Sequence, residues 1–426
     1  MGRMAAFAAP APLAGARSLR SSSAISAPLS ASSFHGSSVT AAAAASPVPR
    51  TRRSTLRMQK SELALEDDLI FVKPDPTKKT LRIGVVGAGR IGQVHATNIT
   101  FRLKNAHLVG VSSGSRELAE RCSLDHGCQP YTDYDEMLEN PELDAVCICS
   151  ASNQHTAQII KAAEAGKHIF CEKPIDLNLE EVDRALMAVR KAGVKLQVGF
   201  NRRFDQNYAR VRRGVSSGEI GKPHMLHITS RDPSPPPLEY VKNSGGIWLD
   251  CSIHDFDMAR FLVADEVEEV YTLGQNNLNP DFEQYGDVDT SLVTMKFKGG
   301  CLASVDNSRQ AVYGYDQRCE VFGEGGSISI NNNYPNSAVI STSKQIKRDL
   351  PMHFFMDRYS ASFITEMSDF CDCVLEDKPI PCTGLDGRAP VVIALAAKKS
   401  YELGRPVKLS EVDRPLPAEL EGWDGQ

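Results

Sequence analysis

Three polar residues from two stretches of the chain could together oxidise an alcohol. Two of them, Asp250 and His254, are four residues apart, a spacing that in a helix places both on one face, one turn apart. A carboxylate that hydrogen-bonds an imidazole holds its tautomer and raises its basicity, which suits removal of a hydroxyl proton near neutral pH. The same pair also fits half of a metal site or a capping pair, but further ligands at metal-binding spacing are missing, so we expect no metal.

The third polar residue is Lys173, in the sequence Cys171-Glu172-Lys173-Pro174 at the end of a predicted strand. Ligands of doubly wound sheets bind beyond the carboxyl ends of the strands. Because Pro174 restricts the backbone of Lys173 to extended conformations, the starting direction of the side chain is fixed. An ammonium fixed beside a nicotinamide could stabilise a developing alkoxide. On position alone, a lysine at a strand end is more often simply solvated.

A glycine-rich turn predicts where a dinucleotide would bind. Gly87, Gly89 and Gly92 follow a β-branched run and open a helical pattern, which is the context that gives this spacing meaning. The first glycine permits a tight turn, the second lets the backbone approach a pyrophosphate, and the third allows close helix–strand packing. We expect the phosphates to contact this turn, including Arg90 and Ile91, at the positive end of the helix. The alternative is an ordinary glycine-rich turn.

The end of the second predicted strand indicates which dinucleotide is preferred. A site specific for NAD would carry an acidic residue there for the ribose hydroxyls, whereas this chain has Ser113 and Arg116. Nothing in that pair repels a 2′-phosphate, so the sequence favours NADP or use of both cofactors. The alternative is a solvated Arg116 and NAD bound by other contacts. We expect three further residues to complete the cofactor site: Ser150, Asn153 and Glu172.

Strands and helices alternate from residue 80 to residue 201. Strands that alternate with helices of ten or more residues predict a parallel sheet covered on both faces, and the handedness of crossovers makes it doubly wound. The expected strands are 80–86, 106–112, 145–150, 168–172 and 195–201, and the expected helices are 94–103, 115–126, 154–165 and 179–192.

The pattern of predicted strands and helices changes after residue 201. Strands joined by Gly, Asn, Asp and Pro turns dominate 222–342, which predicts a large, mostly antiparallel open sheet in a second α/β domain. Its expected strands include 224–231, 267–273, 290–297, 301–305 and 318–322, and its expected helices are 206–214, 255–262, 357–375 and 387–403.

Composition limits the class of protein. The 426 residues are 42% apolar and 24% charged, which is typical of globular proteins. A formal charge of −5 argues against nucleic acid as the main partner, and no apolar run approaches the ~18–20 residues that cross a bilayer. We expect a small-molecule substrate, no nucleic acid and no membrane association.

Charge is spread unevenly along the chain. Residues 1–60 hold eight Lys or Arg and no Asp or Glu, and are rich in Ala and Ser. This composition predicts an organellar transit peptide, with the plastid preferred over the mitochondrion; a tail with no targeting role is the alternative. The expected organisation is a leader (1–60), a linker (61–79), a dinucleotide-binding domain (80–202), a substrate-binding and oligomerisation domain (203–410) and a tail (411–426).

Eleven cysteines form no Cys-x-x-Cys pair and have no His neighbours at zinc-finger spacing. Several fall inside apolar strands, where a free thiol behaves as a small hydrophobic group. We therefore expect a reduced, metal-free chain.

The chain resembles the glucose–fructose oxidoreductase/inositol dehydrogenase/rhizopine catabolism family, and within it the inositol 2-dehydrogenases. The resemblance spans roughly residues 80–410 and is carried by the stretches 84–92 (GVVGAGRIG), 172–174 (EKP), 199–205 (GFNRRFD) and 244–260 (SGGIWLDCSIHDFDMAR). It implies a Rossmann domain, an open-sheet domain that forms dimers or tetramers, and catalytic roles for Lys173, Asp250 and His254. Ser113 departs from the family, whose inositol dehydrogenases usually have an acidic residue at this position.

Taken together, the residues and the resemblance predict oxidation of a ring hydroxyl of a cyclic polyol, with myo-inositol as the leading substrate. His254 takes the proton, Asp250 orients the imidazole and Lys173 stabilises the alkoxide. Four polar residues are expected to bind the substrate: Asn201, Arg203, Asp232 and Tyr315. The alternatives are a dehydrogenase or reductase of another sugar and a non-catalytic sensor of the cofactor.

Overall fold

The computed structural model describes residues 79–426, which belong to one compact unit. The expected leader and all but the last residue of the expected linker lie outside the described residues. In the part of the chain that is described, no helix is both long and apolar enough to cross a bilayer.

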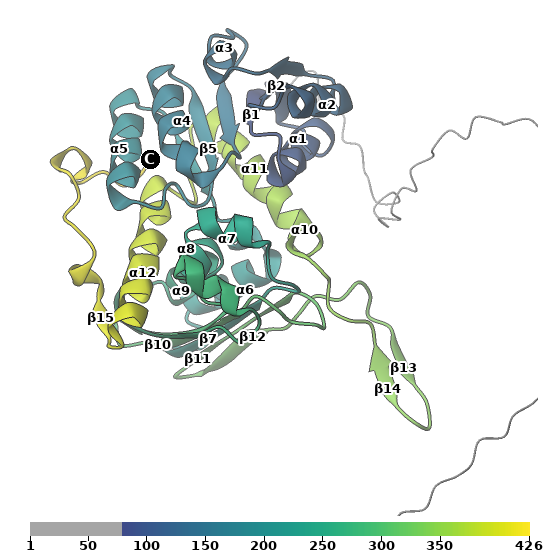
Figure 1. Ribbon diagram of the computed structural model, residues 1–426, viewed down its shortest axis with the longest axis vertical. Helices are drawn as coiled ribbons and strands as arrows, with labels where there is room; N and C mark the ends of the chain where they lie inside the picture. The colour runs from purple at the N-terminus through teal and green to yellow at the C-terminus, as the bar shows by residue number, and fades with distance from the viewer. Residues whose placement is uncertain (1–78) are drawn as a thin grey trace, which may run out of the picture. The chain divides into compact units, whose positions relative to one another are not determined.

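The first sheet is parallel and six-stranded, as the alternating pattern predicts (Figure 1). Its strand order is β3-β2-β1-β4-β5-β6, so the direction in which strands are added to the sheet reverses between β1 and β4. The strands are β1 (Leu81–Val86), β2 (Ala106–Ser112), β3 (Gln129–Tyr131), β4 (Ala145–Ile148), β5 (His168–Glu172) and β6 (Leu196–Gly199). The helices between them are α1 (Arg90–Phe101), α2 (Arg116–His126), α3 (Tyr134–Leu138), α4 (Ser152–Glu164) and α5 (Leu179–Ala192).

Both faces of this sheet are buried, which explains why its strands read as continuous apolar runs. Successive residues of β4 enter different hydrophobic clusters: Val146 and Ile148 belong to one, and Ala145 and Cys147 to the other. Helix α11 (Ser360–Leu375) comes late in the chain, yet it packs on β1 and β5 beside α1. The expected boundary at 202/203 therefore does not separate this helix from the first sheet.

The second sheet has seven strands in the order β12-β11-β7-β10-β9-β8-β15. All neighbouring pairs are antiparallel except β7 and β10, which run parallel with Leu302 opposite Met225. The sheet is thus mixed but mostly antiparallel. The strands are β7 (Pro223–Arg231), β8 (Val267–Gln275), β9 (Thr290–Phe297), β10 (Leu302–Ser308), β11 (Asp316–Gly323), β12 (Gly326–Ile330) and β15 (Val407–Lys408).

Helices cover one face of the second sheet (Figure 1). They are α6 (Gln206–Ser216), α7 (Leu238–Ser244), α8 (Gly246–Asp250), α9 (Ser252–Val263) and α12 (Gly384–Leu403). Alternate strand residues point into this core, and those between them include exposed apolar side chains, namely Met225, Leu273, Leu292, Leu302 and Phe322. A separate hairpin of β13 (Val339–Ser341) and β14 (Ile346–Arg348) leads to the short α10 (Phe355–Arg358).

One expected helix differs in a way that affects the site. A continuous helix would place Asp250 and His254 on one face, but α8 ends at Asp250 and α9 begins at Ser252. Cys251 lies between the two helices, and the amide of His254 donates to its carbonyl oxygen three residues back. The one-turn spacing of a continuous helix therefore does not apply to this pair.

Candidate active site

The glycine-rich turn forms a cradle between β1 and α1. A Cβ built on Gly92 would lie 1.8 Å from the carbonyl oxygen of Gly87, whose own φ is +100°. A Cβ on Gly89 would meet no atom within 4 Å. The backbone amides of the first turn of α1 have no partner within the helix. Close packing on one side and open space beside free amides on the other fit a bound pyrophosphate.

The end of β2 carries hydroxyl groups and no carboxylate. Ser113 Oγ accepts from the amide of Ser115 at 3.3 Å, and Ser115 caps α2 by accepting from the amide of Leu118. The side chain of Arg116 is 75% exposed and pairs only loosely with Glu120, at 3.5 Å. Its guanidinium is therefore free to meet an anion.

The other expected cofactor residues have separate surroundings. Ser150 Oγ donates to Gln158 Oε1 at 2.6 Å, and Asn153 is exposed in the first turn of α4. Glu172 instead points into the core, where its Oε1 lies 2.8 Å from His95 Nε2. Its neighbour Lys173 contacts a different part of the structure, Asp250 at the end of α8.

Lys173 reaches Asp250 across 77 positions of sequence. Its Nζ donates to the backbone oxygen of Asp250 at 2.9 Å and lies 3.6 Å from Asp250 Oδ1. The same carboxylate accepts from the Tyr240 hydroxyl at 2.8 Å and lies 3.5 Å from Arg309 Nη1. Within residues 79–426, no hydrogen bond joins Asp250 to His254. The expected orienting contact is thus replaced by a cluster of two cations and a phenol around Asp250.

His254 is partly exposed and packs edge-on against Phe200. Its Nδ1 is buried and has no hydrogen-bond partner among the described residues. Burial lowers the pKa of the imidazole well below its usual value, and the positive charges of Lys173 and Arg202 lower it further. The ring is therefore neutral at pH 7 and can accept a proton.

Of the four residues expected to bind a substrate, Asp232 contacts Cys251, the residue that follows Asp250. Cys251 Sγ donates to Asp232 Oδ2 at 3.4 Å, and burial, opposed by Arg309, raises its pKa. Tyr315 is buried and its hydroxyl accepts from Arg202 Nη2 at 3.4 Å. Asn201 is buried with its amide 3.5 Å from Ser362 Oγ.

Arg203 is committed to a structural ion pair. Its Nε and Nη2 both donate to the buried carboxylate of Asp257, and Nη2 also donates to Asp386 at 3.0 Å. This bidentate contact ties the turn after β6 to helix α9. The Nη1 of Arg203 donates to the backbone oxygen of Pro381 at 3.4 Å, so each guanidinium nitrogen has a partner outside the Lys173 cluster.

Sequence reasoning missed Tyr240, Arg309 and Asp287. Arg309 is 1% exposed and bridges Asp250 to Asp287, whose Oδ1 accepts from the amide of Ile247. These residues lie far apart in the sequence and fit no local motif. They come together because α7 packs on α8 and because the segments after β10 and before β9 contact α8 through Arg309 and Asp287.

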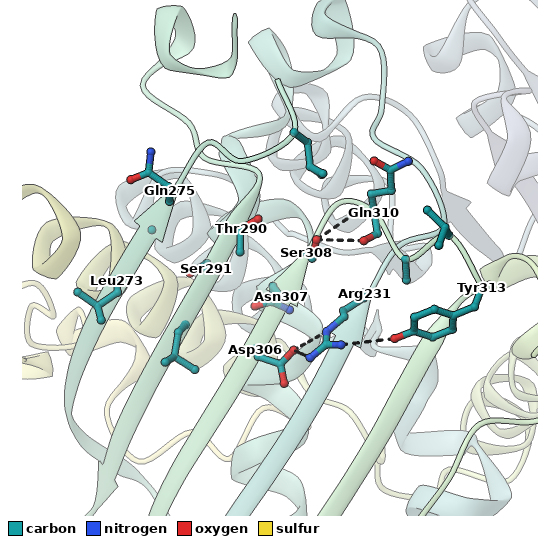
Figure 2. A pocket seen from close by; sticks show the side chains of 15 residues that line it. Arg231, Leu273, Gln275, Thr290, Ser291, Asp306, Asn307, Ser308, Gln310 and Tyr313 are labelled. Atoms are coloured by element: carbon teal, nitrogen blue, oxygen red, sulfur yellow. Dashed lines mark hydrogen bonds and ion pairs between the residues drawn. The ribbon is translucent and has the colours of Figure 1, made fainter. Parts of the chain in front are cut away.

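A cavity of about 650 Å³ lies on the exposed face of the second sheet (Figure 2). Arg231 and Asp306 pair across its floor, beside the Tyr313 hydroxyl and the apolar side chains of Leu273 and Leu292. None of its lining residues belongs to the cradle or the Lys173 cluster. Its place on an open, partly apolar sheet face suits contact with another surface.

Profiles of two protein families match the chain in tandem. The one described as an oxidoreductase family with an NAD-binding Rossmann fold matches residues 81–200, and the GFO/IDH/MocA C-terminal domain matches 208–329. The myo-inositol 2-dehydrogenase of Thermotoga maritima is 45% identical over 336 residues, which cover 78% of this chain and 99% of the relative. The inositol 2-dehydrogenase of Rhizobium meliloti is 41% identical over 78% of this chain and its own full length.

Solved structures show the same arrangement. A probable dehydrogenase from Thermotoga maritima superposes with a TM-score of 0.77 at 45% identity, covering 78% of this chain and 100% of that one. The scyllo-inositol dehydrogenase from Lactobacillus casei, solved with bound NAD(H) and scyllo-inositol, has a TM-score of 0.74 at 31% identity and the same coverage.

The cradle predicts opposite outcomes for two glycine variants. Gly92→Ala should lower the free energy of unfolding by about 3 kcal/mol, because its new methyl group meets backbone rather than a movable side chain. Gly89→Ala, at a φ of −71° in open space, should fold normally but bind NADH about tenfold more weakly. Denaturant unfolding and NADH fluorescence titration measure the two effects; equal stability losses would contradict this assignment.

Arg203→Met should lower the free energy of unfolding by about 3–5 kcal/mol, because Asp257 is left buried without its partner. The matched control is Arg210→Met, which removes an exposed ion pair with Glu219. It should lower the free energy of unfolding by less than about 1 kcal/mol. Urea denaturation of both variants measures the difference. A stable Arg203 variant with a raised KM for substrate would instead make this arginine a substrate ligand.

Proposed function

Since the chain belongs to the GFO/IDH/MocA family of oxidoreductases, we propose that it is an NAD(P)-dependent dehydrogenase that oxidises a ring hydroxyl of a cyclic polyol. Its leading substrate is myo-inositol and the product is 2-keto-myo-inositol. The observation that carries this proposal is the contact of Lys173 with Asp250, which sets an ammonium near the neutral imidazole of His254. The names of the relatives support inositol as the substrate.

Different residues of the chain carry out different parts of the proposed reaction. The cradle and the first turn of α1 would hold the dinucleotide, whose nicotinamide ring accepts a hydride when it is bound. His254 is uncharged and accepts the hydroxyl proton. Lys173 stabilises the alkoxide by charge and by hydrogen bonding, and Asp250 holds the ammonium in place. Asp232, which contacts Cys251, would accept hydrogen bonds from other ring hydroxyls.

The cofactor preference we propose is dual use of NAD and NADP. The end of β2 has no carboxylate that would repel a 2′-phosphate, and the exposed Arg116 can pair with one. Relatives include a scyllo-inositol 2-dehydrogenase of Bacillus subtilis named for NAD⁺, at 40% identity. Ser113 and Arg116 are therefore the residues that would extend this site to NADP.

The exposed face of the second sheet is the surface that we propose for homo-oligomer formation, as a dimer or tetramer. Its exposed apolar side chains and its cavity support this assignment. For residues 1–60 we propose an organellar leader, plastid before mitochondrion. That proposal rests on composition alone, namely eight basic residues and no acidic ones.

Removal of the proton acceptor tests the proposed reaction. His254→Ala should lower kcat for myo-inositol oxidation about 10²–10⁴-fold, the usual contribution of a general base, with NADH affinity unchanged. The control is His107→Ala, at an exposed position of β2. Reduced-nicotinamide absorbance over a panel of inositols and aldoses gives the rates. Turnover of no polyol, with intact NADH binding, would favour the cofactor sensor; turnover of aldoses alone would favour a sugar dehydrogenase.

Ser113→Asp should lower kcat/KM for NADP at least about tenfold relative to NAD, because a carboxylate would then repel the 2′-phosphate. Arg116→Ala should weaken use of NADP only, and the control Arg121→Ala, exposed on the same helix, should change neither. Steady-state kinetics with each cofactor measure the ratio. A wild-type enzyme that cannot use NADP would contradict the dual preference.

A further inference from the structure

Five ionisable side chains meet in the core behind the cofactor cradle, and the reaction above uses none of them. They are His95 on α1, Cys147 and Cys149 at β4, Glu172 on β5 and Glu366 on α11, and all are buried. One ring nitrogen of His95 and one carboxylate oxygen each of Glu172 and Glu366 lie within 4.8 Å of one another. Such a concentration of titratable groups in a core requires a physical explanation.

Glu366 is the member without a partner. Its side chain is fully buried, and neither carboxylate oxygen receives a hydrogen bond from any described residue. The carboxylate of Glu172, by contrast, has a partner, because its Oε1 accepts from His95 Nε2 at 2.8 Å in the tautomer that carries the proton on Nε2. An ionised carboxylate buried without a donor is strongly destabilising, whereas a protonated one can itself donate to a neighbouring carboxylate.

The described groups that face Glu366 include no lysine and no arginine. They are His95 from α1, Cys147 and Cys149 from β4, Glu172 from β5, and Cys382 from the loop before α12. Burial, then the charge of Glu172, raises the pKa of Glu366 well above its usual range. Burial likewise raises the pKa of the Cys147 and Cys149 thiols, so these remain uncharged.

We propose that Glu366 is a positioning residue that stays protonated and shares its carboxyl hydrogen with Glu172. The row of hydrogen bonds Glu366–Glu172–His95 then joins α11, β5 and α1. Lys173 directly follows Glu172, the middle member of this row, in the sequence. The protonation of Glu366 is inferred from the geometry of the cluster. Its consequence for catalysis rests on the proposed function.

The position of the buried cluster indicates which parts of the active site it would hold in place. His95 lies on the helix whose first turn forms the cradle, and Glu172 immediately precedes the lysine that contacts Asp250. Gln197 of β6 donates to the backbone oxygen of Glu366 at 2.8 Å and so fixes this turn of α11. An ionised Glu366 would repel Glu172 and loosen the end of β5, which moves Lys173 relative to the cradle.

The protonation state is tested by equilibrium unfolding of the full chain with chelator present. Folded wild type holds one proton that the unfolded chain releases above the usual glutamate pKa of about 4.3, so its stability falls as pH rises towards the folded pKa. Glu366→Gln carries no such proton. The ratio of the unfolding constants, wild type over Glu366→Gln, should therefore rise about tenfold per pH unit between about pH 5.5 and 7.

The matched control is Glu376→Gln, the same chemical change at the exposed end of α11. For this variant the ratio should stay flat. A flat ratio for Glu366→Gln as well would overturn the proposal, because Glu366 would then be ionised. The donor set of His95 and two carboxylates could also hold a cation; stabilisation of wild type, but not of Glu366→Gln, by added Zn²⁺ would equally overturn it.

The positioning role is tested by comparing Glu366→Gln with Glu366→Met. The Gln amide can donate to Glu172 as the acid does, so NADH affinity and kcat should stay near wild type. The Met variant should bind NADH more weakly and lose kcat about tenfold, with its fold checked by circular dichroism. Equal behaviour of the two variants would overturn the positioning role. If the Met variant does not fold, Glu366→Gln decides it, because loss of NADH affinity and kcat in that variant would also overturn the role. Absence of polyol turnover in wild type would affect only the proposed function, because NADH binding is read by fluorescence.

Discussion

The contact between Lys173 and Asp250 is the constraint on which the rest of the site depends. It joins the carboxyl end of a strand in the parallel sheet to the end of a short helix on the mixed sheet, 77 positions later. The ammonium is held at two points, the backbone oxygen and the carboxylate, so its direction is defined as well as its distance. Arg309 lies 3.5 Å from the same carboxylate and is itself buried, so Asp250 contacts cations from both sheets.

The charges around the contact of Lys173 with Asp250 give the neighbouring side chains different roles. Burial, and then the charges of Lys173 and Arg202, lower the pKa of His254 and keep its imidazole neutral. In the proposed reaction the fixed charge of Lys173 would face the negative charge that develops on the substrate oxygen. Other arginines in the core serve the fold, as the pair of Arg203 with Asp257 does. The chain thus uses buried charge in two ways, and the partners of each arginine distinguish them.

Much of the fold could be predicted because its signals are local. Parallel strands buried on both faces read as apolar runs, and the mixed sheet reads as strands between turn residues, so both sheets could be expected from the sequence. The short β3, α7 and α8 were missed, since three to seven residues are too few for a period to show. The break at Cys251 was missed for a related reason: its surroundings favour helix on both sides, and the bend follows from packing.

The sequence by itself determined the glycine cradle and the presence of a lysine, a carboxylate and an imidazole, because these depend on residue type and on spacing along a few consecutive positions. Only the tertiary structure decided their partners. Asp250 meets Lys173, Tyr240 and Arg309 instead of His254, and Arg203 turns to Asp257 instead of towards the site. The physical reason is that a buried charge pairs with whichever opposite charge the packing of distant elements brings within reach, and spacing along the chain carries no record of that choice.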